Sequence, residues 1–121
     1  MIDIDRLNDI KIENYIFIIY YIIITISLYA NKVETEYLIT DNKEIREKYR
    51  KLLFVIFGTA FLVYLYYTIS NYDDYIEDNN PNSKRLNGLT FLASFLVLIS
   101  GTIYLYVIYE DKDVNIELAF N

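Results

Sequence analysis

Three long apolar runs alternate with charged segments along the chain, and this pattern predicts three membrane-spanning helices. The runs cover residues 15–30, 52–70 and 89–109, and none of them contains Asp, Glu, Lys or Arg. A helix needs about 20 apolar residues to cross the roughly 30 Å hydrocarbon core of a bilayer. The first run is shorter, so we expect local thinning of the bilayer or neighbours that cover its ends. The predicted fold is an all-α, three-span transmembrane protein that forms one integral membrane domain over residues 1–121.

A charged amphipathic arm, residues 41–51, precedes the second run with no Pro or Gly between them. Asp41 and Glu44 have the spacing of a capping box, so we expect the arm helix to begin at Asp41. The arm then forms a long amphipathic extension of the second transmembrane helix. Two interpretations stay open: a docking arm for a partner subunit, or a solvated helix stabilised by its own Glu–Lys pairs. The docking face recurs at helical spacing and consists of Ile45, Tyr49, Leu52 and Leu53.

The other segments are predicted to be polar connections. Residues 1–14 alternate apolar and acidic side chains and lack the basic region of a signal peptide, so we interpret them as a tail at the membrane surface. Residues 31–40 are expected to form a loop. Residues 71–88 contain four clustered carboxylates and the only proline, Pro81, and are expected to form the one linker. The spacing of the carboxylates differs from that of calcium-binding loops, so we predict a solvated acidic turn.

Small residues in the second and third runs predict faces where another helix comes close, because van der Waals contact drives helix association in lipid. These packing residues are Gly58, Thr59, Ala60, Thr90, Ala93, Ser94, Val97 and Gly101. Tyrosines near the ends of the runs predict aromatic belts at the membrane surfaces, with a quinone or sterol pocket as the alternative. The interfacial aromatics are Tyr15, Tyr29, Tyr66, Tyr67, Tyr72, Tyr104, Tyr106 and Tyr109.

The composition excludes most side-chain chemistry. The chain has no Cys and no His, which removes disulfides, thiolate ligands and the commonest ligand of haem, zinc and copper. Ionisable groups inside a membrane mark proton and ion paths, and the three runs contain none. The net charge of −6 argues against nucleic acid and against a polybasic patch on an anionic membrane. We therefore expect no catalytic, cofactor-binding or metal-binding residues and no enzymatic activity in this chain.

Basic residues divide unevenly between the two sides of the predicted membrane. Residues 31–51 and the C-terminal tail carry seven Lys and Arg, whereas the N-terminal tail and residues 71–88 carry four. The positive-inside rule then places the arm and the C-terminus in the cytoplasm or the mitochondrial matrix. Residues with AT-rich codons, above all Ile and Tyr, are abundant, which indicates the genome of an organelle, a low-GC bacterium or a large DNA virus.

Three spans in a chain of this length resemble the NADH dehydrogenase subunit 4L family of respiratory complex I. The third run ends at Tyr109, and a charged segment leads to Val114, Asn115, Ile116 and Glu117, which is similar to an Asn-Ile-Asp motif of that family. The resemblance implies a small subunit of the mitochondrial inner membrane. The family carries a glutamate in each of its last two spans for proton translocation and has a shorter first loop. This chain has neither glutamate, so no catalytic residue is carried over.

Two functions of different classes follow. The first is a non-catalytic structural or accessory subunit of a larger membrane complex, with a respiratory-chain assembly in an energy-transducing membrane as the favoured complex. Its partners are then other membrane subunits and lipid, without nucleic acid, metal or cofactor. The alternative is a holin-like pore-forming protein of a phage or low-GC bacterium, located in the bacterial plasma membrane.

Overall fold

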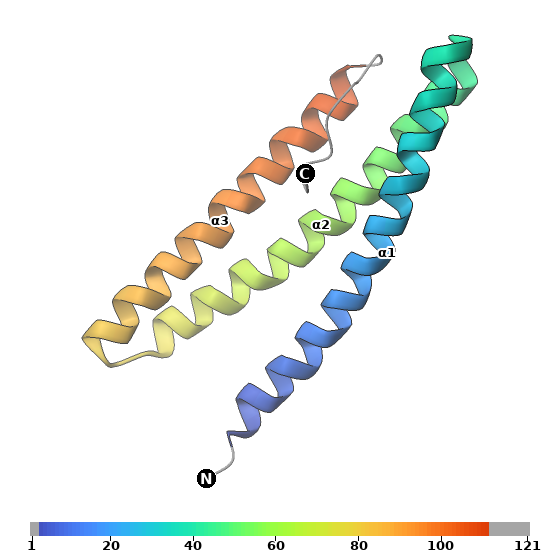
Figure 1. Cartoon of the computed structure of the whole chain (residues 1–121). Coiled ribbons are helices and arrows are strands. Elements are labelled where there is room, and N and C mark those ends of the chain that lie inside the picture. The colour runs from blue at the N-terminus through green and yellow to red at the C-terminus, as the bar shows by residue number, and fades with distance from the viewer. Residues whose placement is uncertain (1–2, 112–121) are drawn as a thin grey trace. The chain divides into compact units, whose positions relative to one another are not determined.

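A computed structural model describes residues 3–111, and these form three α-helices without any strand (Figure 1). The helices are α1 (Ile4–Thr40), α2 (Lys43–Glu77) and α3 (Pro81–Glu110). At 1.5 Å per residue they are about 55, 52 and 45 Å long. Each helix is long and apolar enough to cross a membrane. The prediction of an all-α protein with three helices that suit a membrane is thereby confirmed, and these helices indicate an integral membrane protein.

The described chain divides into two compact units. The first unit contains α1 and residues 43–52 of α2, and the second contains residues 53–77 of α2 together with α3. Each unit is a pair of helices joined by a short connection. We call them the first hairpin and the second hairpin.

In the first hairpin, α1 continues ten residues beyond the predicted span, so the prediction of a loop over residues 31–40 is wrong. Ala30 and Val33 are buried and Tyr37 is half-buried, which continues one helix face at helical spacing. Packing on this face stabilises a helix that its charged residues alone would leave marginal. The helix ends at Asp41, whose backbone is left-handed with φ 51° and whose N–H donates to the Tyr37 carbonyl at 2.7 Å.

The arm helix α2 begins two residues later than predicted and with a different cap. Asn42 caps it, because its side-chain oxygen accepts a hydrogen bond from the Glu44 N–H at 2.9 Å and its carbonyl accepts one from the Arg46 N–H at 3.1 Å. Asp41 instead occupies the left-handed position of the turn, which Asp and Asn tolerate better than most residues. The capping box predicted from Asp41 and Glu44 is therefore wrong.

The N-terminal segment is also more ordered than its polar pattern suggested. Asp3 caps α1 by accepting a hydrogen bond from the Arg6 N–H at 3.0 Å. Two turns further on, the Arg6 guanidinium forms an ion pair with Glu13 at 3.0 Å. The helix consequently starts at Ile4 rather than at the beginning of the first apolar run.

In the second hairpin, the linker predicted over residues 71–88 is wrong for most of its length. Its first part ends α2 and its last part begins α3, so only residues 78–80 connect the two helices. Pro81 occupies the start of α3, where a missing N–H costs nothing and the fixed φ suits a helix. Asn80 caps the same end by accepting a hydrogen bond from the Asn82 N–H at 3.0 Å. Proline therefore initiates a helix here.

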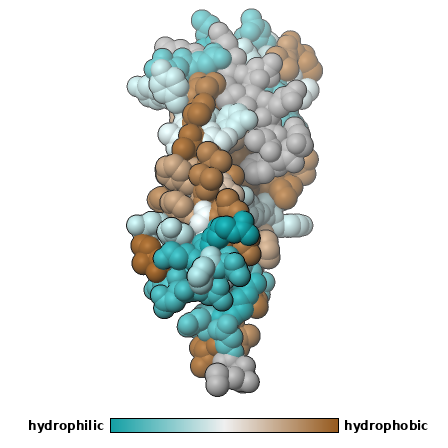
Figure 2. Space-filling view, turned by 90° about the vertical axis from the view of Figure 1, so that its left-hand side faces the viewer, coloured by the Kyte–Doolittle hydropathy of each residue, from teal (hydrophilic) through white to brown (hydrophobic). Residues whose placement is uncertain are grey.

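Aromatic contacts set the antiparallel register of the second hairpin. The ring centroids of Tyr72 and Phe91 are 5.3 Å apart near the connection, and those of Phe57 and Tyr104 are 5.1 Å apart near the other end. Such pairs are worth about 0.5–1.5 kcal/mol beyond their buried area. On the face seen in Figure 2, a band of hydrophobic side chains lies above the hydrophilic side chains that surround the α2–α3 connection.

Candidate functional site

The predicted packing stripe of α3 is divided between the outside and the inside of the second hairpin. Thr90, Ala93 and Val97 are exposed. Ser94 is buried, and its hydroxyl accepts a hydrogen bond from the Asn71 amide at 3.2 Å. Gly101 is half-buried. The exposed part of the stripe is thus available to a neighbour, while Ser94 is used within the chain.

The glycines show where the chain itself needs a small residue. A Cβ atom added at Gly58 or at Gly101 would meet no atom within 4 Å. A Cβ atom added at Gly88 would lie 3.1 Å from Cε2 of Tyr75. A close helix contact inside the second hairpin therefore lies at Gly88, which the sequence pattern did not predict as a packing residue. The other predicted packing residues of α2, Thr59 and Ala60, are half-buried.

The predicted docking face of the arm is partly covered by the chain. Tyr49 is 1% exposed and Leu53 is fully buried, whereas Ile45 and Leu52 are half-buried. The Tyr49 hydroxyl donates a hydrogen bond to the Glu34 carboxylate of α1, and burial together with this bond raises the pKa of Tyr49. Within the first hairpin, the buried Tyr49 links this face to α1 through Glu34.

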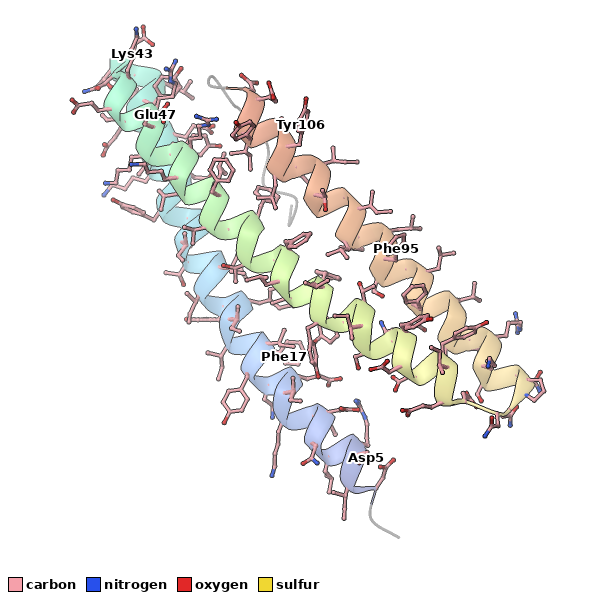
Figure 3. All side chains as sticks on the ribbon, turned by 180° about the vertical axis from the view of Figure 1, so that it is seen from behind. Asp5, Phe17, Lys43, Glu47, Phe95 and Tyr106 are labelled. Carbon is pink, nitrogen blue, oxygen red and sulfur yellow. The ribbon has the colours of Figure 1, made fainter. Side chains whose placement is uncertain are left out.

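Polar atoms crowd the turn end of the first hairpin, around Lys43 and Glu47 (Figure 3). Lower on the hairpin, Nζ of Lys48 lies 5.0 Å from the centroid of the Tyr29 ring. A hydrogen bond with the Tyr29 hydroxyl and, more weakly, the charge of Glu36 raise the pKa of Lys48. One predicted interfacial tyrosine is thereby paired with a basic residue of the arm.

Most of the other predicted interfacial aromatics point outward. Tyr67 and Tyr104 are half-buried, and Tyr104 stacks on Phe57. The exposed ones are Tyr15, Tyr29, Tyr66, Tyr72, Tyr106 and Tyr109.

The acidic turn between α2 and α3 is organised by Asp78. Its two carboxylate oxygens accept hydrogen bonds from the Asn80 N–H and from the Asn87 amide, both at 2.9 Å. Hydrogen bonds from Ser83 and from the Asn80 N–H hold the pKa of Asp78 below its usual value, and Lys84 adds to this effect. Within residues 3–111, no three carboxylates come together as ligands for a metal ion. The carboxylate of Asp78 therefore joins the connection to the first turns of α3 by hydrogen bonds.

We expect acid to loosen this connection through Asp78. Because its pKa is lowered in the folded state, its contribution to stability is complete above the ordinary value of 3.8 and is lost as the pH falls through the folded value. The difference in SDS unfolding midpoint between pH 7 and about pH 3 should be smaller in Asp78→Asn than in the unaltered chain. The variant Asp73→Asn changes an exposed carboxylate near the end of α2 and serves as the control. Equal acid sensitivity of Asp78→Asn and the unaltered chain would contradict this role.

Sequence reasoning missed three cross-helix contacts: the hydrogen bond between Asn71 and Ser94, the contact of Tyr75 with Gly88, and the hydrogen bond between Tyr49 and Glu34. Each depends on the register that the two short connections impose. Comparison with protein-family models, with curated proteins and with solved structures gives no match. The arrangement of the described residues is one of helix packing, charge pairing and aromatic contact.

Proposed function

We propose that this chain is a non-catalytic structural subunit of a larger membrane complex and acts by packing its helices against other subunits. One observation carries the proposal. In the most apolar stretch of α3, only 11% of the residues are buried inside the chain, and the exposed residues there include the small side chains Ala93 and Val97. Thr90, just before this stretch, is exposed as well.

Small residues on an open helix face favour a protein neighbour. Lipid tails are as apolar as leucine, so helix association in a membrane depends on close packing between backbones. The second hairpin does not use the space at Gly58 or Gly101, since an added Cβ atom would touch nothing at either position. A helix from another subunit is the neighbour that makes use of this space.

For the complex itself we propose a respiratory-chain assembly like complex I, in the mitochondrial inner membrane. The support is the resemblance to the NADH dehydrogenase subunit 4L family in span number and length, together with the organelle-like composition. The motif that adds to this resemblance, residues 114–117, lies outside the described residues. The missing glutamates assign this chain an accessory role. The uneven distribution of basic residues supports a matrix location for the turn of the first hairpin.

A native gel of mildly solubilised source membranes tests the proposal. The chain is detected by antibody, and NADH dehydrogenase activity is stained in the same lane. Migration with a large stained complex is the expected result. Migration with a large unstained complex would keep the structural role and overturn the respiratory assignment. Migration as a small homo-oligomer would overturn both, and a holin-like pore would become the function to test by dye release from vesicles.

The variant Gly101→Leu should reduce assembly without affecting membrane insertion. A bulky side chain keeps a partner helix away from the backbone, and extra atoms in a packed contact typically cost about 1–3 kcal/mol. We therefore expect the affinity for the complex to fall about tenfold. The control Ile103→Leu changes an exposed residue of the same helix at nearly constant volume. Resistance to carbonate extraction measures insertion and should be the same for both variants. Normal incorporation of Gly101→Leu would contradict a packing role for this face.

A further inference from the structure

We propose that the first hairpin binds the phosphate group of anionic phospholipids through a lysine cluster formed by Lys32, Lys48 and Lys51. The cluster lies where the apolar runs of both helices meet the charged end of the hairpin. The proposal concerns lipid and does not depend on the identity of the complex.

The register of the hairpin brings the three lysines to one face. Lys48 contacts Tyr29 across the two helices, with its Nζ 5.0 Å from the ring centroid. Residues three apart on a helix are neighbours on its surface. Lys32 is therefore next to Tyr29 on α1, and Lys51 is next to Lys48 on α2. Lys32 and Lys51 are also equally far along the chain from the turn at residues 41–42, which puts them at the same level in an antiparallel pair.

The charges on this face leave the lysines available to an anion. All three lysines are exposed. Glu36 is the carboxylate whose charge acts on Lys48. Glu34 accepts the hydrogen bond of the buried Tyr49, and Glu47 lies 3.9 Å from Arg50. Glu44 lies one turn above Lys48 and is the remaining carboxylate of α2 in this hairpin.

Local charge thus differs from the charge of the whole chain. Residues 43–51 contain five basic and two acidic side chains, although the net charge of the protein is −6. Net charge by itself argues against a polybasic patch on an anionic membrane. The turn at residues 41–42 places Lys32 of α1 at the level of Lys51 of α2, so it adds a basic residue to those of α2 that the net charge does not report.

The position of the lysine cluster relative to the apolar runs favours a lipid phosphate as its ligand. The apolar runs end at Ala30 and begin at Leu52, so Lys32 and Lys51 are the first charged residues outside them. At 1.5 Å per residue their Cα atoms lie within about 3 Å of the apolar boundary. The headgroup region extends roughly 5–8 Å beyond that boundary on each side. Lysine side chains extend to this depth from a helix end, and basic residues next to a span attract anionic lipids.

Native mass spectrometry of the full chain in neutral detergent micelles tests the proposal. Dioleoylphosphatidylglycerol and dioleoylphosphatidylcholine are added in turn, and the bound lipids are counted. The unaltered chain should bind phosphatidylglycerol preferentially. The triple variant K32Q/K48Q/K51Q should lose this preference, with affinity reduced about fivefold for each lysine removed. The control triple variant K11Q/K84Q/R85Q removes the same charge from positions outside residues 31–51 and should keep the preference.

The other outcomes separate the alternatives. Equal binding of both lipids by the unaltered chain, or equal losses in the two triple variants, would overturn the cluster as a lipid site. Displacement of phosphatidylglycerol by inorganic phosphate would show a site for soluble phosphate and overturn the lipid assignment. Helix content by circular dichroism monitors folding. If K32Q/K48Q/K51Q loses helix, the double variant K32Q/K51Q, which spares the Lys48–Tyr29 contact, must show the loss of preference or the proposal fails.

Discussion

Replacement of Tyr49 with alanine is expected to lower the free energy of unfolding by about 3–5 kcal/mol, the range for removal of a large aromatic side chain from a packed core. Tyr49 is 1% exposed, and its hydroxyl is bonded to Glu34 on the facing helix. Alanine would leave a cavity and remove the donor to the carboxylate. SDS titration in mixed micelles, followed by circular dichroism, measures the loss.

The variant Tyr49→Phe separates packing from hydrogen bonding. It keeps the ring and removes only the hydroxyl, so we expect a loss of about 1.5 kcal/mol, as for a hydrogen bond to a charged group. A loss as large as that of Tyr49→Ala would show that the ring contributes little, against the burial seen here. The control Tyr15→Ala changes a tyrosine of α1 that is 69% exposed and should have little effect on unfolding.

The hydrogen bond between Tyr49 and Glu34 also predicts how the stability of the folded chain changes at alkaline pH. The pKa of Tyr49 is raised above its ordinary value of 10.0 in the folded state. Its contribution to stability is therefore complete below about pH 10 and is lost as the pH rises further, because the unfolded chain ionises first. The stability difference between the unaltered chain and Tyr49→Phe should shrink above this pH. A constant difference would indicate that the hydroxyl is solvated in the folded state.

Replacement of Gly88 with leucine is expected to destabilise the second hairpin by about 1–3 kcal/mol, the usual cost of forcing extra atoms into a packed contact. Even the first added atom would lie 3.1 Å from Cε2 and 3.3 Å from Cδ2 of Tyr75. Nζ of Lys84 on α3 lies 4.9 Å from the centroid of the Tyr75 ring, so movement of the ring would also disturb this contact. The larger side chain of leucine would therefore have to push the Tyr75 ring away from α3.

Two controls isolate the contact at Gly88. Gly101→Ala adds a Cβ atom where no atom lies within 4 Å, and alanine has a higher helix propensity than glycine by about 1 kcal/mol. This variant should be neutral or slightly stabilising. The double variant Gly88→Leu with Tyr75→Ala should lose less than the sum of the two single losses, since removal of the ring makes room for leucine. Additive losses would contradict the contact.

The three membrane-spanning helices and the exposed tyrosines near their ends could be predicted, because composition and local pattern decide them. The three apolar runs are uninterrupted by charge, so membrane-spanning helices follow from transfer energetics alone. Positions of exposed tyrosines such as Tyr15 and Tyr106 follow from the ends of the runs. These inferences need no knowledge of which helix touches which.

Helix ends could not be predicted in the same way. Residues 31–40 read as a loop because their charged side chains give only a weak apolar pattern. In the structure, Val33 and Tyr37 continue the inward face of α1. Packing of this face within the first hairpin stabilises the helix over residues 31–40. Pro81 read as the centre of a linker, although a proline after a capping residue starts a helix equally well. The choice between these two roles depends on the contacts that form further along the chain.

The sequence alone determined that the chain is helical, that three of its segments suit a bilayer, and that side chains for redox or thiolate chemistry are missing. Only the tertiary structure decided that Tyr49 faces inward, that Ser94 is used within the chain while Ala93 stays exposed, and that Lys48 lies over the Tyr29 ring. The physical reason is register. Turns at residues 41–42 and 78–80 set which residues of successive helices lie at one level, and hydrogen bonds of a few side chains define those turns.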